Sequence, residues 1–317
     1  MKFGVNILSR GPMATREGYI EVAAAAEKLG FGFVSVNDHV VVPGDIASRY
    51  PYSEGGDWGN ASSGQCLEQL SALAFLAACT QKIELLTSVM VVPHRQAILA
   101  AKMIATADVL SNGRVIVGCG AGWMKEEIEA LGAPFEARGK LTDEYIQAFR
   151  ELWTKPRPTF KGEHVAFENV LFEPKPVRKP HPPIWIGGES KAGIERAIRY
   201  GDGWYPGSSN PINRLDTADR VATAMADFKV TAKAKGRDPA TINLAHVVLW
   251  PVSFEAEAAI SGGRRTMTGS AAELIADART LAATGISHVN LSFHAPTIAG
   301  IIERMQKFSG DVLAKIG

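Results

Sequence analysis

The chain has 317 residues, 46% of them hydrophobic and 21% charged, an ordinary globular composition with enough apolar side chains for a large core. Its 34 basic and 33 acidic residues leave a net charge of +1 without a basic run, which argues against nucleic acid or an anionic membrane as main partner. Three scattered cysteines without a CxxC pair, with no N-terminal signal or long apolar run, predict a reduced, cytoplasmic protein.

The first half of the chain alternates between strand-like and helix-like segments. Strands are predicted at 2–8, 33–37, 83–90 and 114–119, and helices at 17–29, 66–80 and 95–110. In the last of these helices, apolar spacing predicts one buried face, made of Ile98, Leu99, Met103, Ile104, Ala107 and Leu110. The strand, helix and strand over 83–119 form a βαβ unit, whose strands must be parallel. Ligands bind at the carboxyl ends of such strands, so we expect this unit to form the floor of a site.

The alternation resumes after the proline-rich stretch 154–183, which is expected to be a surface insertion. Helices are predicted at 125–131, 141–153, 191–200, 212–235, 270–283 and 298–315, and strands at 183–186, 203–205, 242–250 and 288–293. Eight strand–helix pairs predict one domain, residues 1–317, folded as a (β/α)8 TIM barrel with insertions after strands 2, 4 and 7. An open, doubly wound sheet has the same local pattern and is the alternative.

Two glycine-rich turns follow predicted strands. Residues 118–122 (GCGAG) fail the dinucleotide pattern G-x-G-x-x-G because Trp123 stands where glycine is required, which leaves a tight turn or a close approach of backbone to a flat ring. Gly187, Gly188 and Ser190 open a helix, where backbone N–H groups bind phosphate well, although Ser190 can also simply cap the helix.

Polar and aromatic residues mark the same predicted edge of the barrel. His39 follows strand two, where a histidine can donate or accept a proton near neutral pH, although a structural role is the alternative. The other histidines lack ligand spacing, so no metal site is predicted. The long loop 40–64 carries Tyr50, Tyr52 and Trp58, and together with 251–268 it is expected to form substrate walls or a lid.

In their order and spacing, several segments together resemble the bacterial luciferase-like monooxygenase superfamily, in particular its F420-dependent oxidoreductases. They are NDH at 37–39, TSV at 87–89, SNGRVIVGCGAGWMKEE at 111–127, PPIWIGGESKAGIERAIRYGDGW at 182–204 and TGSAAELIADARTLAATGISHVNLSF at 268–293. The resemblance covers essentially the whole chain.

The resemblance implies a barrel that holds F420 or, alternatively, FMN at the carboxyl ends of its strands. It implies a non-proline cis peptide at Ser88–Val89 behind the central ring, and His39 beside the reactive ring atom as proton donor or acceptor. The other positions that match the family's cofactor site are Asp38, Thr87, Gly120, Glu126, Gly187, Gly188 and Ser190. Family members are often dimers, so a homodimer is expected.

One departure from the family concerns the substrate. In the related F420-dependent glucose-6-phosphate dehydrogenases, a catalytic glutamate occupies the position of Trp123. Trp123 therefore argues against sugar-phosphate oxidation and suggests an aromatic wall over the ring. With Tyr50, Tyr52 and Trp58 as further substrate-pocket candidates, it predicts a small, fairly apolar organic substrate.

Two reactions and one non-catalytic role remain compatible with the residues. With F420 the expected reaction is hydride transfer at the ring, and with reduced FMN it is oxygenation of the substrate. A non-catalytic flavin-binding barrel is a further alternative. A sugar-phosphate isomerase or aldolase is disfavoured, because such barrels bind phosphate after strands seven and eight, whereas this glycine turn follows strand five.

Overall fold

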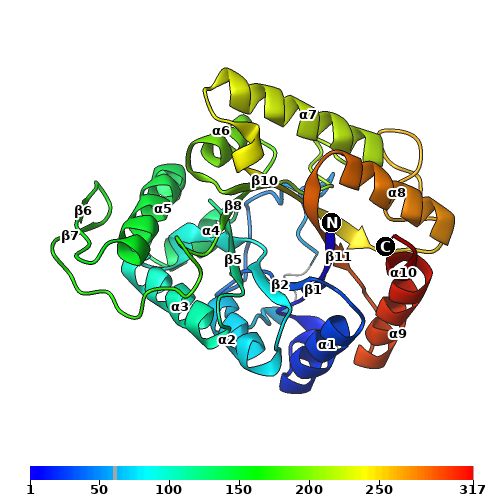
Figure 1. Cartoon of the computed structure of the whole chain (residues 1–317), viewed down its shortest axis with the longest axis horizontal. Helices are drawn as coiled ribbons and strands as arrows, with labels where there is room; N and C mark the ends of the chain where they lie inside the picture. The colour runs from blue at the N-terminus through cyan, green and yellow to red at the C-terminus, as the bar shows by residue number, and fades with distance from the viewer. Residues whose placement is uncertain (60–62, 317) are drawn as a thin grey trace.

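The computed structural model describes residues 1–59 and 63–316 and shows a closed parallel barrel surrounded by helices (Figure 1). Its strands are β1 (Lys2–Ile7), β2 (Phe33–Val36), β3 (Glu84–Thr87), β4 (Met90–Val91), β5 (Val115–Gly120), β8 (Ile184–Gly187), β9 (Gly203–Tyr205), β10 (Asn243–Pro251) and β11 (Ile286–Ser292). They are paired in the order β3-β2-β1-β11-β10-β9-β8-β5-β4, and a further pairing of β3 with β5 closes the ring. The predicted TIM barrel is confirmed, because in an open doubly wound sheet β3 and β5 would not pair with each other.

The helices follow the predicted sequence, with corrections at their ends. They are α1 (Arg16–Lys28), α2 (Gln69–Cys79), α3 (Ala97–Leu110), α4 (Lys125–Ala130), α5 (Arg138–Thr154), α6 (Lys191–Tyr200), α7 (Ala218–Ala234), α8 (Ala271–Ala283), α9 (Ile298–Phe308) and α10 (Ala314–Ile316). Helix α2 begins later than predicted because the carboxylate of Glu68 accepts hydrogen bonds from the backbone of Leu70 (3.1 Å) and Ser71 (2.6 Å). Helix α7 likewise begins after Thr217, which caps it, rather than at residue 212.

The third strand position of the barrel is divided into β3 and β4. Leu86 of β3 pairs with Ile116, and Met90 of β4 pairs with Cys119, both on β5. Four steps along one strand therefore match three steps along its neighbour, which is the signature of a β-bulge with one additional residue. The prediction of one uninterrupted strand over 83–90 is wrong at this point, and the bulge contains Ser88 and Val89.

Two apolar cores hold the barrel together. The larger one lies between strands and helices, and the smaller one fills the barrel interior with Phe33, Leu86, Ile116, Trp185, Tyr205, Ala245 and Val247. Alternate residues of each strand supply the two cores, as expected for a closed sheet covered on its outer face. The interior is therefore packed with side chains below the carboxyl ends of the strands, and only its mouth is available to a ligand.

The predicted buried face of α3 is wrong in part. Ile104 and Ala107 are buried, but Ile98, Leu99 and Leu110 are 43%, 54% and 61% exposed. The buried side of the helix is rich in alanine, at positions 97, 100, 101 and 105. Small side chains let the helix approach the barrel closely, which turns its bulky side chains outward.

The segment between α5 and β8 contains an antiparallel hairpin, β6 (Phe160–Lys161) and β7 (Ala166–Phe167), which projects from the barrel (Figure 1). None of the helices within residues 1–59 and 63–316 has both the length and the apolar character that a bilayer crossing requires.

Candidate active site

A cavity of about 500 Å³ opens at the carboxyl ends of the strands. Twelve predicted site residues line it: Asp38, His39, Tyr50, Tyr52, Trp58, Ser88, Val89, Gly120, Trp123, Gly187, Gly188 and Ser190. They come from segments far apart in the sequence, so the fold brings together most of the predicted site. The structure places Thr87 and Glu126, two predicted cofactor residues, outside this lining.

The bulge of the third strand forms the floor of the cavity. The Ser88–Val89 peptide bond is cis, as the family resemblance implied. The Val89 side chain lies between two glycines, and a Cβ atom on Gly120 or Gly187 would stand only 2.8 or 3.1 Å from its methyl groups. Glycine at both positions therefore leaves room for the bulge, and it keeps the backbone on either side accessible to a ligand.

Below the floor, a buried hydrogen-bond chain holds Ser88. The side-chain amide of Asn290 donates to the hydroxyl of Tyr205 (2.9 Å), and this hydroxyl lies 2.9 Å from Oγ of Ser88. Burial raises the pKa of Tyr205 above its ordinary value, so the phenol remains protonated, and its hydroxyl shares a hydrogen bond with the Ser88 hydroxyl. Tyr205 ends β9 and was not predicted as a site residue, although its place at the carboxyl end of a barrel strand is a signal that could have found it.

A carboxylate orients the predicted proton donor. Nδ1 of His39 lies 2.7 Å from Oε2 of Glu127, whose Oε1 accepts hydrogen bonds from the backbone N–H groups of Val40 (2.7 Å) and Val41 (3.2 Å). Burial raises the pKa of Glu127, but the hydrogen bond and charge of His39, together with His94 and the Val40 N–H, outweigh it and lower the pKa below its ordinary value. An ionised carboxylate only accepts, so the proton of neutral His39 is on Nδ1, and Nε2 remains for the cavity.

Glu127 lines the cavity and contacts His39, and the sequence prediction missed it. Its neighbour Glu126 was predicted instead, but Oε1 of Glu126 accepts hydrogen bonds from the backbone of Ala47 (2.9 Å) and Ser48 (3.0 Å). The two glutamates are adjacent on α4, and only the position of the loop after β2 distinguishes their roles. Both of them fix this loop to α4.

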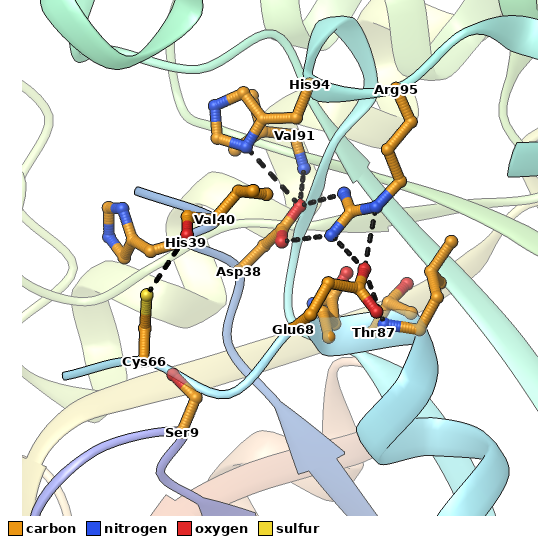
Figure 2. Close-up of polar contacts among 12 residues, drawn as sticks. Ser9, Asp38, His39, Val40, Cys66, Glu68, Thr87, Val91, His94 and Arg95 are labelled. Atoms are coloured by element: carbon orange, nitrogen blue, oxygen red, sulfur yellow. Dashed lines mark hydrogen bonds and ion pairs between the residues drawn. The ribbon is translucent and has the colours of Figure 1, made fainter. Parts of the chain in front are cut away.

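The carboxylate of Asp38 is engaged within the protein (Figure 2). Arg95 donates from Nη1 to Oδ2 (2.9 Å) and from Nη2 to Oδ1 (2.8 Å), and the backbone of Val91 donates to Oδ2 (2.9 Å). Arg95 also donates from Nε to Glu68 (2.8 Å). This cluster joins β2, β4 and the start of α2 beneath the cavity wall, so Asp38 stabilises the position of His39 at the next residue.

The aromatic wall forms on one side of the cavity. The ring of Trp58 lies 4.5 Å from His39 and 5.9 Å from Trp123, measured between centroids. Tyr50 lies 5.2 Å from Trp123 and 5.7 Å from Tyr52 in edge-to-face geometry. The four predicted substrate-pocket residues therefore make one continuous apolar surface next to His39.

The second glycine turn leads into α6. Gly188 has φ +100°, a conformation that side chains rarely adopt, and the hydroxyl of Ser190 accepts a hydrogen bond from the backbone of Gly193 (3.1 Å). Arg196, from the next turn of the helix, also lines the cavity. Backbone N–H groups, a helix N-terminus and a guanidinium at one end of the cavity suit a phosphate.

Glu189, between Gly188 and Ser190, is buried and connects the turn before α6 with the segment after β9 through hydrogen bonds. It accepts hydrogen bonds from the backbone N–H of Gly207 and from the side-chain amide of Asn210. Burial raises the pKa of Glu189 to about 7, and the hydrogen bond of Gly207 opposes this shift. The carboxyl group therefore changes its protonation state close to neutral pH, next to the predicted phosphate turn.

The residues present fit a flavin-type cofactor. Gly120 and Gly187 leave room for the Val89 side chain and expose backbone beside it, so a flat ring can approach the main chain there. The turn at Gly188 and Ser190 supplies donors for an anionic tail at one end of the same cavity. These two features lie at adjacent strand positions, β5 and β8.

Comparisons with known proteins agree with this geometry. The family model of luciferase-like monooxygenases matches residues 1–291. The FMNH(2)-dependent dimethylsulfone monooxygenase of Pseudomonas putida is 32% identical over 164 residues, which are 51% of this chain and 43% of that protein. The matched region thus spans less than half the length of that enzyme.

Solved structures show the same fold at lower sequence identity. Monooxygenase RslO1 from Streptomyces bottropensis is 20% identical, with a TM-score of 0.74, and the whole of both chains is covered. An F420-dependent secondary alcohol dehydrogenase, solved in complex with an F420-acetone adduct, is 19% identical with a TM-score of 0.73, covering 100% of this chain and 99% of that one.

Proposed function

Because the chain belongs to the luciferase-like monooxygenase family and is an enzyme of the flavin-dependent oxidoreductase class, we propose that it uses F420 to oxidise or reduce a small organic substrate. The observation that carries the proposal is the cavity itself. A bulged floor between two glycines, a phosphate-type turn and a histidine held by a buried carboxylate all face one space of about 500 Å³.

The protein binds and orients the two reactants. Val89 and the backbone of Gly120 and Gly187 would support the ring, and Gly188 with Ser190 would hold the phosphate of the tail. When bound, the cofactor supplies the transfer of electrons or hydride. The aromatic wall excludes water from the substrate and packs against its apolar part, which favours a substrate with an apolar body.

His39 manages the proton that accompanies the redox step. His39 lines the cavity and its Nδ1–H donates to Glu127 at 2.7 Å, so Nε2 is the nitrogen that would exchange a proton with the substrate. The carboxylate fixes the ring orientation and stabilises the imidazolium when Nε2 takes up a proton. A residue that acts in this way contributes about 10²- to 10⁴-fold to the rate of a reaction.

Similarity to the FMNH(2)-dependent dimethylsulfone monooxygenase favours a second candidate, oxygenation of the substrate with reduced FMN. Titration with F420 and with FMN, each under aerobic and anaerobic conditions, distinguishes the two. Tight binding of F420 with a shift of its absorbance supports the proposal, and tight binding of FMN alone replaces it with the second candidate. Binding of neither cofactor contradicts both.

Loss of turnover in a His39→Ala variant that still binds cofactor supports the assigned proton transfer. Equal turnover of the variant and the wild-type protein would remove His39 from the mechanism. The matched control is His164→Ala, because His164 lies on the segment between α5 and β8 and does not line the cavity.

We further propose that the chain acts as a single barrel domain, with 154–183 as a surface insertion, and that it forms a homodimer. The observation in favour of the dimer is the outward face of α3, where Leu99 and Leu110 are 54% and 61% exposed. Leu99→Glu should convert the dimer into a monomer in light scattering after gel filtration. Val230→Glu, at an apolar residue 69% exposed on α7, is the matched control and should not change the mass.

A further inference from the structure

Arg10 lines the cavity from the segment after β1, three residues beyond the end of that strand. Its backbone is fixed on both sides. The backbone of Ser9 donates to the side-chain oxygen of Asn37 (3.0 Å), and Ser9 accepts a hydrogen bond from the backbone of Leu67 (2.8 Å). On the other side, the backbone of Gly11 donates to Gln65 (3.2 Å). The guanidinium is therefore presented from a well-anchored segment rather than from a mobile loop.

Among the residues that the structure describes, the guanidinium of Arg10 has an aromatic neighbour but no carboxylate partner. Its central carbon lies 5.5 Å from the centroid of Trp58, in the aromatic wall. Two carboxylates line the cavity, and both are engaged elsewhere: Asp38 binds Arg95, and Glu127 binds His39. Partly buried charges are normally paired with an opposite charge, and the guanidinium of Arg10 has no such partner among the described residues.

The second arginine of the cavity lining differs in this respect. Arg196 donates to the carboxylate of Asp143 and to the carbonyl of Gly139 (3.1 Å). Burial lowers the pKa of Arg10, but a guanidinium is so strong a base that it remains a cation at neutral pH. Burial likewise lowers the pKa of His294, which also lines the cavity, and the charges of Arg10 and Arg304 lower it further, so this imidazole stays neutral.

The position of Arg10 in the ring of strands assigns it to the substrate end of the cavity. Strands β1 and β8 are four places apart in either direction around the closed barrel, so they face each other across its mouth. The phosphate-type turn follows β8, and Arg10 follows β1. Arg10 and His39 both contact Trp58, which places the free cation on the side of the proton donor and away from the tail of the cofactor.

We propose that Arg10 binds an anionic substituent of the substrate, such as a carboxylate or a sulfonate, whose apolar body packs against Trp58 and Trp123. The inference rests on the proposed function and adds a substrate class to it. A guanidinium donates two parallel hydrogen bonds to either oxyanion, which gives orientation as well as affinity. An anion fixed at Arg10 would hold the rest of the substrate beside His39.

Calorimetric titration of the full chain with hexanoate, hexanesulfonate and neutral hexanamide tests the proposal, with and without the bound cofactor. The wild-type protein should bind both anions about 10- to 100-fold more tightly than hexanamide, the range expected for a charge-assisted hydrogen-bond pair. Arg10→Met should abolish this preference, and Arg10→Lys should retain part of it. Arg16→Met, at an exposed arginine on α1, is the matched control and should keep the full preference.

Three outcomes would overturn the proposal. One is a wild-type protein that binds the anions no better than hexanamide. Another is an Arg10→Met variant that folds and keeps the preference. The third is an Arg10→Lys variant that keeps the full anion preference but loses affinity for F420 or FMN, because the guanidinium would then serve the ring. If the wild-type protein binds neither cofactor, the proposed function fails, while the titration without cofactor still decides the role of Arg10.

Discussion

Replacing Glu127 by glutamine tests whether this carboxylate positions His39. The substitution preserves shape but removes the charge. The amide oxygen of the glutamine can still accept hydrogen bonds from the backbone N–H groups of Val40 and Val41, whose nitrogens are 2.7 and 3.2 Å from Oε1 in the wild-type protein. The amide NH2 group then faces Nδ1 of His39 and donates to it, so the proton of the neutral imidazole moves to Nε2.

The expected loss follows from the contact that disappears. The 2.7 Å hydrogen bond between His39 and Glu127 is charge-assisted, and such bonds contribute about 1.5–3 kcal/mol. If this energy is available in the transition state, kcat should fall roughly 10- to 100-fold. KM should change little, because Glu127 bonds to His39 and to backbone rather than to the apolar wall.

The assay combines steady-state kinetics with long-range ¹H–¹⁵N correlation spectra of the imidazoles, which report the tautomer of His39. Glu129→Gln is the control, since Glu129 lies on the same helix and is 51% exposed. Melting temperature and cofactor affinity separate a lost function from a lost fold. A Glu127→Gln variant with wild-type kcat and an unchanged tautomer would refute the reasoning, as would an equal loss in the control.

Three further results are expected. Gly188→Asp places a carboxylate next to the phosphate and should weaken cofactor binding at least about tenfold in a fluorescence titration. The control is Gly132→Asp, at a glycine of comparable φ outside the cavity lining, which should leave cofactor binding unchanged. Equal effects of the two substitutions would count against the phosphate site. Burial raises the pKa of Glu189 from 4.5 to about 7. Between pH 4.5 and about pH 7 the folded protein therefore retains a proton that the unfolded chain releases. As the pH rises through this range, the contribution of Glu189 to the free energy of unfolding should fall by roughly 3 kcal/mol. Urea denaturation should show a smaller fall in Glu189→Gln, and identical pH profiles would contradict the assignment. Ser270→Ala removes the capping box of α8 and should cost about 1 kcal/mol of unfolding free energy by the same method, while Ser270→Asp should retain most of it; no loss in the alanine variant would argue against the cap.

The order of strands and helices was predictable because its signals are local. Helix α6 and strand β9 have the bounds that the sequence predicts. Most of the site residues predicted from the ends of strands and the loops after them do line the cavity, since parallel strands bring their carboxyl ends to one face. The cis bond at Ser88–Val89 was predicted from family resemblance, and nothing in the local residues indicated it.

The remaining features depend on contacts between distant segments. The face of α3 was misassigned because periodicity identifies apolar sides but not which of them meets the barrel, and small alanines pack there while Leu99 points outward. Glu127 could not be distinguished from Glu126, since its partner His39 is 88 residues away in the chain. Arg10 was missed because an arginine after a strand is ordinary, and only the lack of a carboxylate among its described neighbours makes it informative.

The extra residue in the third strand position also sets which side chains point inward beyond it. In an uninterrupted strand, inward and outward side chains alternate, so Leu86 inside the barrel would be followed by Ser88 and Met90 on the same side. Instead Ser88, Val89 and Val91 line the cavity, while Met90 packs in the outer core. The phase of the alternation is thus inverted after the bulge. Deleting one residue here would remove the bulge and one side chain that lines the cavity, while Met90 and Val91 would keep their present sides, so the cavity floor depends on the extra residue and the packing beyond it does not.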